Sequence, residues 1–390
     1  MKRLIFVFKE VPYDSQPQDT GVGQYILDLA QGLKDRWEVI IITKHHTNQY
    51  HTYFYNGVKI IALPCYGLFG LNSVKIIDYL LYNLEVLFVL LRVIIKGGKP
   101  TVIEFANWET DGFLFSLANH FFKIPIIVRL HSGSLLHRQS THLNFATQLI
   151  HFFETYVSRQ NFTNLICSTK THAQISLANY AIKKHVTIIP LGLVVPKKLA
   201  PFPVTNNMNI LYVGRIEEKK GVGEILQAME AILDCYPKAH FHFIGNDYDK
   251  FWQSKKALQF SDVLRSNATI HGYVARHELA EFFRRATLCV FPSYYESFGL
   301  TAAQAMAFGK AVISTKVGGI PTVIEHMKDG FLIPPRDPSA LAEAVLYLLR
   351  NKSVRERLMK NAPKKVKNFF SMEAMIRSSD EFYSSLIRSL

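Results

Sequence analysis

The chain has 390 residues, 48% of them hydrophobic, and a formal net charge of +14. This length suffices for two ordinary domains with full cores, and the hydrophobic fraction excludes a disordered chain. The charge fits an anionic membrane surface, a nucleic acid or anionic substrates. Because it is spread over both halves, with no basic tail and no nucleic-acid-binding motif, we expect no nucleic acid partner.

The four cysteines are far apart and lack the spacing of a metal site; they are Cys65, Cys167, Cys235 and Cys289. We interpret them as free thiols in a reducing compartment and expect a cytoplasmic protein. The apolar run Leu4–Phe8 is too short for the h-region of a signal peptide, so it predicts a first β-strand instead.

Strands and helices alternate along the whole chain. The predicted strands are Leu4–Phe8, Val39–Thr43, Lys59–Leu63, Thr101–Glu104, Ile126–Leu130, Asn164–Ser168, Asn209–Val213, His240–Ile244, Thr269–His271, Leu288–Phe291 and Ala311–Ser314. The predicted helices are Tyr25–Asp35, Val74–Lys96, Phe113–Phe122, Gly223–Cys235, Arg276–Arg285 and Pro338–Arg350. This order is typical of parallel sheets covered by helices.

The segment Pro196–Met208 holds three prolines and several polar residues, and we interpret it as a linker. The fold class predicted is therefore α/β, with two Rossmann-like doubly wound domains facing each other across a cleft. The first spans residues 1–200 and the second residues 208–370. We expect residues 371–390 to form an amphipathic helix that crosses back to the first domain.

The run Ile76–Ile95 is nearly as long as a membrane span. However, Asp78, Glu85 and Arg92 recur every seven residues and so share one stripe of a helix. Each would cost roughly 2.5–3.5 kcal/mol near a bilayer centre. The pattern favours a helix buried on most of its surface, with contact at a membrane interface as the alternative.

The block Pro292–Leu332 carries the clearest site signal. A buried strand ends at Pro292, and an Ala-rich helix follows from Thr301. Free amides at Phe298, Gly299 and Leu300 would thus lie at a helix N-terminus, where phosphate oxygens bind well. Glu296 has the wrong charge for phosphate and is suited to accept hydrogen bonds from hydroxyls. Together they indicate a sugar phosphate or nucleotide sugar, although a solvated Glu in an ordinary strand–turn–helix is an alternative.

Three further positions are candidates for the same chemistry. Gly214, Arg215 and Lys220 follow a strand, and two cations there would clamp a pyrophosphate and stabilise its departure. The pair Gly21 and Gly23 precedes a helix and would expose amides. His131 comes at the carboxyl end of a predicted strand, where functional residues collect in open α/β sheets.

Each candidate has a plainer alternative. The Arg215–Lys220 segment could be a solvated basic loop, the Gly21/Gly23 pair an ordinary turn, and His131 a buried core histidine. Asp247-Tyr-Asp249 has the form of a metal-binding Asp-x-Asp, but its polar loop favours a solvated pair, and we expect no metal.

The chain resembles the retaining, nucleotide-sugar-dependent glycosyltransferases of family four, which have the GT-B fold. The matching segments are the Gly21/Gly23 loop, RLHS at His131, VGRIEEKKG, GYVARHELAEFFRRA, FPSYYESFGL, VGGIP and FSMEAMI. The resemblance implies that Arg215 and Lys220 hold the donor diphosphate with amides at Gly21, Gly299 and Leu300. It also implies that Glu296 binds the transferred sugar and that His131 contacts it from the other domain.

The same resemblance completes the donor-binding set with Gly23, Gly214, Tyr273, Val274, Phe298 and Gln304, and it implies transfer without a metal or other cofactor. Three positions depart from the family pattern. Gln304 replaces the second Glu, eight residues after the first, that grips the nucleotide ribose. Pro190-Leu-Gly-Leu replaces a PNGVD-like turn, and Pro321-Thr322 replaces Pro-Glu.

The first hypothesis is a hexosyl-type glycosyltransferase that moves a sugar from a UDP- or GDP-sugar to a saccharide or lipid-linked saccharide in cell-envelope polysaccharide synthesis. The basic charge of the chain and the apolar helix Ile76–Ile95 predict peripheral contact with an anionic membrane, at the inner face of the cell membrane. Gln304 motivates the alternative, a non-catalytic nucleotide-sugar-binding subunit.

Overall fold

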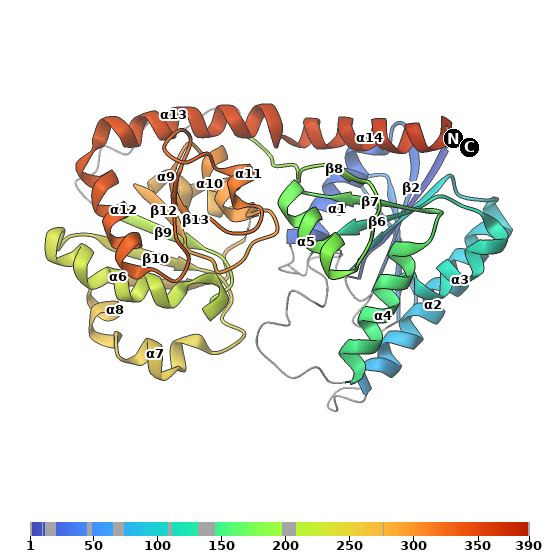
Figure 1. Cartoon of the computed structure of the whole chain (residues 1–390), viewed down its shortest axis with the longest axis horizontal. Helices are drawn as coiled ribbons and strands as arrows, with labels where there is room; N and C mark the ends of the chain where they lie inside the picture. The colour runs from blue at the N-terminus through green and yellow to red at the C-terminus, as the bar shows by residue number, and fades with distance from the viewer. Residues whose placement is uncertain are drawn as a thin grey trace. The chain divides into compact units, whose positions relative to one another are not determined.

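The computed structural model describes residues 2–9, 11, 21–44, 49–64, 74–107, 111–131, 145–196, 208–275 and 277–388. The chain divides into two compact units (Figure 1). The first comprises Met1–Gly192 and Met372–Leu390, and the second Leu193–Ser371. The C-terminal helix α14 (Met372–Arg388) thus belongs to the first unit, where it packs against α1 (Gly21–Leu33).

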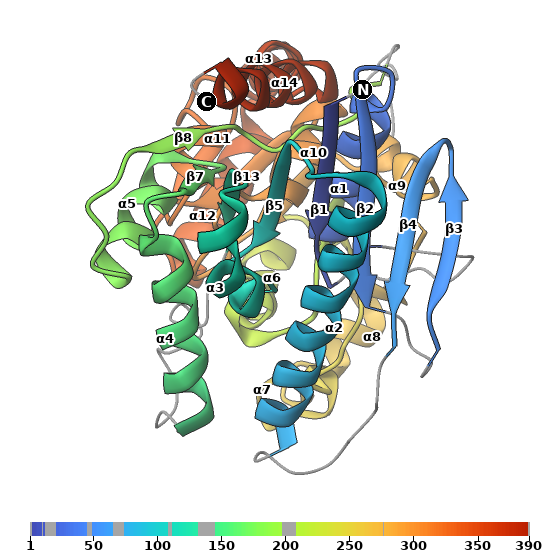
Figure 2. The same cartoon turned by 90° about the vertical axis from the view of Figure 1, so that its right-hand side faces the viewer.

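The first unit is built on an eight-stranded sheet with the order β3-β4-β2-β1-β5-β6-β7-β8. Its strands are β1 (Lys2–Val7), β2 (Trp37–Lys44), β3 (His51–Tyr55), β4 (Val58–Leu63), β5 (Val102–Ala106), β6 (Ile126–Leu130), β7 (Thr163–Cys167) and β8 (Val186–Ile188). Its other helices are α2 (Val74–Gly97), α3 (Phe113–Phe122), α4 (Phe145–Arg159) and α5 (Lys170–Asn179). Neighbouring strands run parallel except for β3 and β4, the antiparallel pair at one edge of the sheet (Figure 2).

The edge pair β3–β4 is joined by a tight hairpin turn. Asn56 and Gly57 form the turn and have positive φ values of 48° and 86°. A two-residue turn of this kind needs φ above zero at both positions, and Asn-Gly is its preferred sequence. The Asn-Gly signal was in the sequence, but the prediction omitted β3, a short edge strand whose five residues are half-buried or exposed.

The second unit is built on a six-stranded parallel sheet with the order β11-β10-β9-β12-β13-β14. The strands are β9 (Asn209–Val213), β10 (His240–Ile244), β11 (Ala268–Gly272), β12 (Leu288–Phe291), β13 (Ala311–Thr315) and β14 (Phe331–Ile333). The α-helices are α6 (Val222–Cys235), α7 (Lys255–Leu258), α8 (Ser261–Asn267), α9 (Leu279–Arg285), α10 (Leu300–Ala307), α11 (Ile320–Val323), α12 (Pro338–Arg350) and α13 (Lys352–Phe369). In chain order this is 3-2-1-4-5-6, the Rossmann order, and the first sheet has the same crossover between β1 and β5.

Both cores are formed by continuous apolar strands, as expected where helices cover the sheet. In the second unit Leu288 and Ile313 of the strands pack with Leu226 of α6 and Leu348 of α12, all fully buried. In the first unit all five residues of β6 are buried. The predicted α/β class with Rossmann-like doubly wound sheets is therefore confirmed for each unit.

The predicted elements agree with the observed ones where apolar residues dominate. Six predicted strands or helices have the observed bounds without change, among them β9, β10 and β12. Helix α1 begins at Gly21, four residues before the predicted start, because the glycine pair belongs to its first turn. The prediction omitted the three-residue strands β8 and β14 and the helices α4, α5, α7, α8, α11 and α13. Residues 197–207 of the predicted linker lie outside the described residues.

Helix α2 differs from the expectation of a helix buried on most of its surface. One face packs into the core through Tyr82, Val86 and Leu90. The opposite face exposes apolar side chains; we call Ile77, Leu80, Leu84 and Phe88 the α2 apolar stripe. An apolar run alone does not show which of its residues face the sheet, so the prediction was wrong on this point. Among the described residues no helix is long and apolar enough to cross a membrane.

Candidate active site

In the second unit, the loops that follow β9 and β12 leave the sheet at its topological switch point. Ligands of open α/β sheets bind at this point, outside the carboxyl ends of the strands. Strand β12 is registered against β9 only at Leu288 and Cys289, which pair with Ile210 and Leu211. Arg215 and Lys220 follow β9, and Glu296 follows β12, so the topology places these predicted residues at one end of one sheet.

Lys220 and Glu296 form an ion pair there. Lys220 Nζ lies 2.6 Å from Glu296 Oε1, and about a fifth of each side chain is exposed, at 20% and 19%. The hydroxyl of Ser293 donates a second hydrogen bond to the same Oε1 at 3.1 Å. Contacts to a cation and a hydroxyl fix the carboxylate, while its partial exposure leaves room for a ligand hydroxyl.

Backbone contacts hold the loop after β9 against the loop after β12 and so bring Lys220 close to Glu296. The N–H of Tyr294 donates to the carbonyl of Lys219 at 2.9 Å. Gly221 lies directly against Pro292, since a Cβ on Gly221 would fall 2.1 Å from the Pro292 carbonyl oxygen. The Lys-Lys-Gly turn and the start of the Pro292 loop are therefore packed backbone to backbone, and the ion pair follows from that packing.

The Gly318-Gly319 loop holds Glu296 from the other side. The N–H of Gly319 donates to the Glu296 carbonyl at 2.8 Å. Gly318 has φ +47°, and a Cβ there would meet the same carbonyl oxygen at 2.0 Å. Glycine is therefore needed at position 318, and the Gly-Gly segment positions the backbone of the candidate sugar-binding carboxylate.

Arg215 is more exposed than Lys220. Its guanidinium pairs with Glu217 at 3.1 Å, and 54% of its side chain is exposed. The hydroxyl of Tyr212 donates to the Arg215 carbonyl at 2.7 Å, and the N–H of Gly214 donates to Ile244 at 2.9 Å. The backbone at Gly214 and Arg215 is thus fixed, while the Arg215 side chain reaches into solvent.

Helix α10 begins at Leu300, with Gly299 as its N-cap at φ +91°. The ring of Phe298 is buried and packs edge-on against Phe370 at 5.5 Å, so only its backbone is available to a ligand. Gln304 is half-buried on the same helix, and its side chain has no hydrogen-bond partner within the described part of the chain. Tyr273 and Val274 follow β11, exposed and half-buried respectively.

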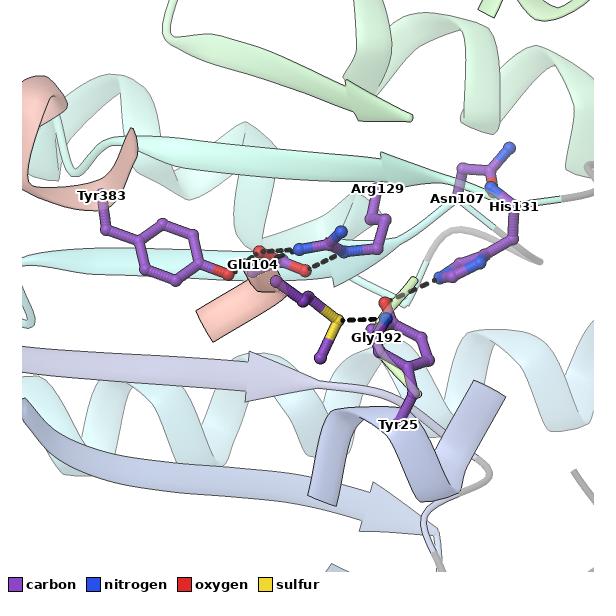
Figure 3. A network of polar contacts seen from close by, with 8 residues as sticks. Tyr25, Glu104, Asn107, Arg129, His131, Gly192 and Tyr383 are labelled. Carbon is purple, nitrogen blue, oxygen red and sulfur yellow. Dashed lines mark hydrogen bonds and ion pairs between the residues drawn. The ribbon is translucent and has the colours of Figure 1, made fainter. Parts of the chain in front are cut away.

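In the first unit, His131 follows β6 and Gly21 and Gly23 lie in the first turn of α1. The ring of His131 is buried, and its Nε2 lies 3.2 Å from the hydroxyl of Tyr25 (Figure 3). The backbone N–H of His131 donates to Asn107 Oδ1 at 2.7 Å. Burial, with smaller contributions from the Arg129 charge and His172, lowers the pKa of His131 to about 3, so the imidazole is neutral at physiological pH.

An ion pair lies next to this histidine on the same sheet. Arg129 Nε donates to Glu104 Oε1 at 2.6 Å, and both side chains are almost fully buried. The hydroxyl of Tyr383, on α14, donates to Glu104 Oε2 at 2.7 Å (Figure 3). A buried ion pair needs further hydrogen bonds to offset its desolvation, and Tyr383 supplies one of them.

The Asp-x-Asp sequence has a structural use. The Asp247 carboxylate accepts the N–H groups of Phe251 and Trp252 at 2.6 and 3.1 Å and so caps a short turn. No group of three or more His, Cys, Asp or Glu side chains suited to a metal is found among the described residues. Cys167, Cys235 and Cys289 are free thiols, and Cys65 lies outside the described residues.

The sequence did not reveal several residues of these two sites. Ser293 stands three residues before Glu296, and that spacing was the only available signal for it. Tyr25 and Tyr383 meet His131 and Glu104 across 106 and 279 residues, and no local pattern marks such contacts.

Two sheets with the crossover of the Rossmann fold, one of them with a paired lysine and carboxylate at its switch point, define an α/β protein suited to a ligand with phosphate and hydroxyl groups. Residues 200–365 match the family "Glycosyl transferases group 1" and residues 20–192 match the "Glycosyl transferase 4-like domain". The chain therefore belongs to the group 1 glycosyl transferases, enzymes that transfer a sugar from a nucleotide sugar. This confirms the family resemblance seen in the sequence.

Known proteins similar to this chain agree with that assignment. A glycogen synthase of Mycobacterium tuberculosis is 24% identical over 292 residues, which cover 74% of this chain and 69% of that protein. A capsular polysaccharide biosynthesis glycosyltransferase, CapM, of Staphylococcus aureus is 26% identical over 47% of this chain and 48% of its own. The structure of a sucrose-phosphate synthase from Thermosynechococcus elongatus matches with a TM-score of 0.82 and 21% identity over 100% of both chains, and the predicted GT-B fold is confirmed.

Proposed function

We propose that this enzyme is a retaining glycosyltransferase that uses a UDP- or GDP-sugar and a saccharide or lipid-linked saccharide acceptor in cell-envelope polysaccharide synthesis. The observation that carries the proposal is the Lys220–Glu296 pair at the switch point of the second unit. A cation for the diphosphate and a carboxylate for sugar hydroxyls are the two groups such a donor requires. The similarity to the capsular polysaccharide enzyme supports the envelope role.

In the proposed reaction, the bond between the anomeric carbon and the diphosphate oxygen breaks while the acceptor hydroxyl attacks the same face. The proton of that hydroxyl passes to the departing phosphate oxygen. Lys220 and Arg215 neutralise the charge that develops on the diphosphate, together with the amides at Gly299 and Leu300. An ammonium has three N–H donors, so Lys220 keeps its bond to Glu296 while it binds phosphate.

The first experiment screens thermal stabilisation of the protein against a panel of UDP- and GDP-sugars. A ligand at a hundred times its dissociation constant adds roughly 2.7 kcal/mol to the free energy of unfolding. Release of the nucleoside diphosphate is then followed for the donor so identified. We expect Glu296→Ala to abolish transfer and Glu325→Ala, which removes an exposed carboxylate in the same unit, to leave it unchanged. Equal activity of both variants would contradict the role of Glu296.

We propose that transfer needs no metal, because Lys220 and Arg215 supply the positive charge. The rate should be unchanged by EDTA, and Lys220→Ala should lower it in the presence and absence of Mg²⁺ alike. A rate that EDTA abolishes and Mg²⁺ restores would contradict this. The comparison separates a metal requirement from the loss of the lysine.

We also propose that the α2 apolar stripe rests on an anionic membrane. Phe88 and Leu84 are 57% and 52% exposed, and the chain carries a net charge of +14. Flotation with vesicles of anionic lipid at physiological salt should recover the protein, and Leu84→Gln with Phe88→Gln should weaken recovery. Leu258→Gln, which removes an exposed leucine from the second unit, is the control. Absence of flotation in the unaltered protein would exclude the membrane contact.

A further inference from the structure

The hydroxyl of Tyr25 contacts the ring of His131, and no sequence motif or family match gives Tyr25 a role. We propose that Tyr25 is a positioning residue that holds His131 in the tautomer with the proton on Nδ1 and so presents that N–H to an oxygen of the transferred sugar. The proposal rests on the proposed function for the sugar contact, whereas the tautomer is a property of the first unit alone.

The contact is buried and well defined. Tyr25 is only 2% exposed, and its hydroxyl oxygen lies 3.2 Å from His131 Nε2. The two rings are 5.7 Å apart and tilted by 57°, and Phe8 meets the imidazole edge-on from a second direction at 6.1 Å (Figure 3 shows the tyrosine and histidine). Asn107 holds the backbone of His131, so both the main chain and the ring have fixed neighbours.

The direction of the hydrogen bond follows from the balance of donors and acceptors. Within the described residues Nε2 is the only hydrogen-bond partner of the Tyr25 hydroxyl. If Nε2 carried the proton and donated it, the hydroxyl proton would be buried without an acceptor, an arrangement more costly than an unused lone pair. The hydroxyl therefore donates to Nε2, and the neutral ring carries its proton on Nδ1.

The charges around this pair favour the same state. Burial raises the pKa of the Tyr25 phenol far above its usual value, so the hydroxyl keeps its proton. The Arg129 guanidinium lies 5.5 Å from the centre of the Tyr25 ring, and it and His172 disfavour a second proton on His131. Within the described residues no side chain or backbone group bonds Nδ1, which leaves that N–H for a ligand oxygen.

The neighbouring ion pair explains why Tyr25 stays in place. The Arg129 guanidinium lies over the Tyr25 ring, and Glu104 holds that guanidinium at 2.6 Å. Tyr383 donates to the same carboxylate. An arginine fixed on one side by a carboxylate gives the aromatic ring a rigid, charged neighbour. The chain of contacts therefore runs from α14 through Glu104, Arg129 and Tyr25 to His131.

The test is ¹⁵N NMR of the full chain with ¹⁵N-labelled histidine. Comparison with His131→Asn assigns the two ring nitrogens among the 15 histidines. We expect a pyrrole-type signal for Nδ1 and a pyridine-type signal for Nε2, and in Tyr25→Phe two averaged signals. Tyr82→Phe removes another buried hydroxyl of the same unit and should leave the His131 signals unchanged.

The same variants are compared in the transfer assay with the donor found in the panel. Tyr25→Phe should lower kcat/KM by about two- to tenfold, the range for loss of one neutral hydrogen bond. A wild-type His131 that is averaged or protonated on Nε2 overturns the proposal, even if Tyr25→Phe fails to fold. A fixed Nδ1–H tautomer in Tyr25→Phe overturns it as well. If the tautomer responds as expected but His131→Asn transfers sugar at the wild-type rate, the positioning stands and the proposed sugar contact fails.

Discussion

Gly299 joins the loop after β12 to the start of α10, and its left-handed backbone conformation disfavours any residue with a side chain. We predict that Gly299→Ala lowers the free energy of unfolding by about 1–2 kcal/mol for the left-handed conformation, and by about 1 kcal/mol more for crowding. The added Cβ would lie 2.3 Å from Cδ1 of Ile320 at φ +91°. Urea denaturation measures this change.

Gly272→Ala is the matched control for that measurement. Gly272 also has a positive φ, +67°, but a Cβ there meets nothing within 4 Å. It therefore reports the backbone contribution alone in the same unit. Equal losses of stability in the two variants would show that Ile320 yields without strain.

Gln304 lies in the same helix and offers an uncharged acceptor where the resemblance to the family-four glycosyltransferases implies a carboxylate. We predict that Gln304→Glu tightens donor binding by about 1 kcal/mol, from the difference between neutral and charge-assisted hydrogen bonds to the ribose. Calorimetric titration with the donor measures it. Pyrophosphate has no ribose, so its affinity should not rise; a rise for both ligands, or none for the donor, would contradict ribose binding by this residue.

At the scale of elements, two side chains of α14 form hydrogen bonds that hold this helix against the rest of the first unit. Tyr383 donates to the buried Glu104, and Asp380 accepts from Trp37 Nε1 at 2.7 Å and Arg36 at 2.5 Å. We predict that Tyr383→Phe costs about 1.5–3 kcal/mol, the value of a hydrogen bond to a charged group. Amide hydrogen exchange of Met372–Arg388 should accelerate.

Ser385→Ala is the control on the same helix, since among the described residues the Ser385 hydroxyl bonds only within α14, to the carbonyl of Phe382. Its exchange pattern should match the wild type. Acceleration in both variants would mean that local helix stability, rather than docking through Tyr383, sets the exchange rate.

At the scale of the whole molecule, buried neutral histidines make stability depend on pH. Burial lowers the pKa of His172 to about 4, while an unfolded histidine titrates near 6.5. Between these values the unfolded chain binds more protons, so the stabilisation is complete above pH 6.5 and is lost as the pH falls toward 4. His131 acts in the same direction, with its pKa of about 3.

We predict that lowering the pH from 7 to 5 reduces the free energy of unfolding by about 2 kcal/mol through His172. Urea denaturation of the wild type and of His172→Gln at both pH values isolates the contribution of His172 to the free energy of unfolding, because all carboxylates are common to the two proteins. An identical pH dependence in the variant would show that another group is responsible.

Much of the fold could be predicted because the strands are short apolar runs that end at polar or turn-forming residues. Strands β9, β10 and β12 were located residue by residue, whereas the face of α2 exposed to solvent could not be found. Periodicity shows that a helix has an apolar surface, but packing against the sheet decides which part of it is covered. The three-residue strands β8 and β14 carry too few residues for any pattern.

The candidate site divides in the same way. Its residue types and their order along the chain, from Arg215 and Lys220 to Glu296 and Gln304, are properties of the sequence, and they predict a phosphate- and hydroxyl-binding function. The Lys220–Glu296 pair joins residues 76 apart, and the Tyr25–His131 contact joins residues 106 apart. Local chemistry thus determines what each side chain can do. Only the order of the strands in the sheets decides which side chains meet, because that order depends on every crossover between them.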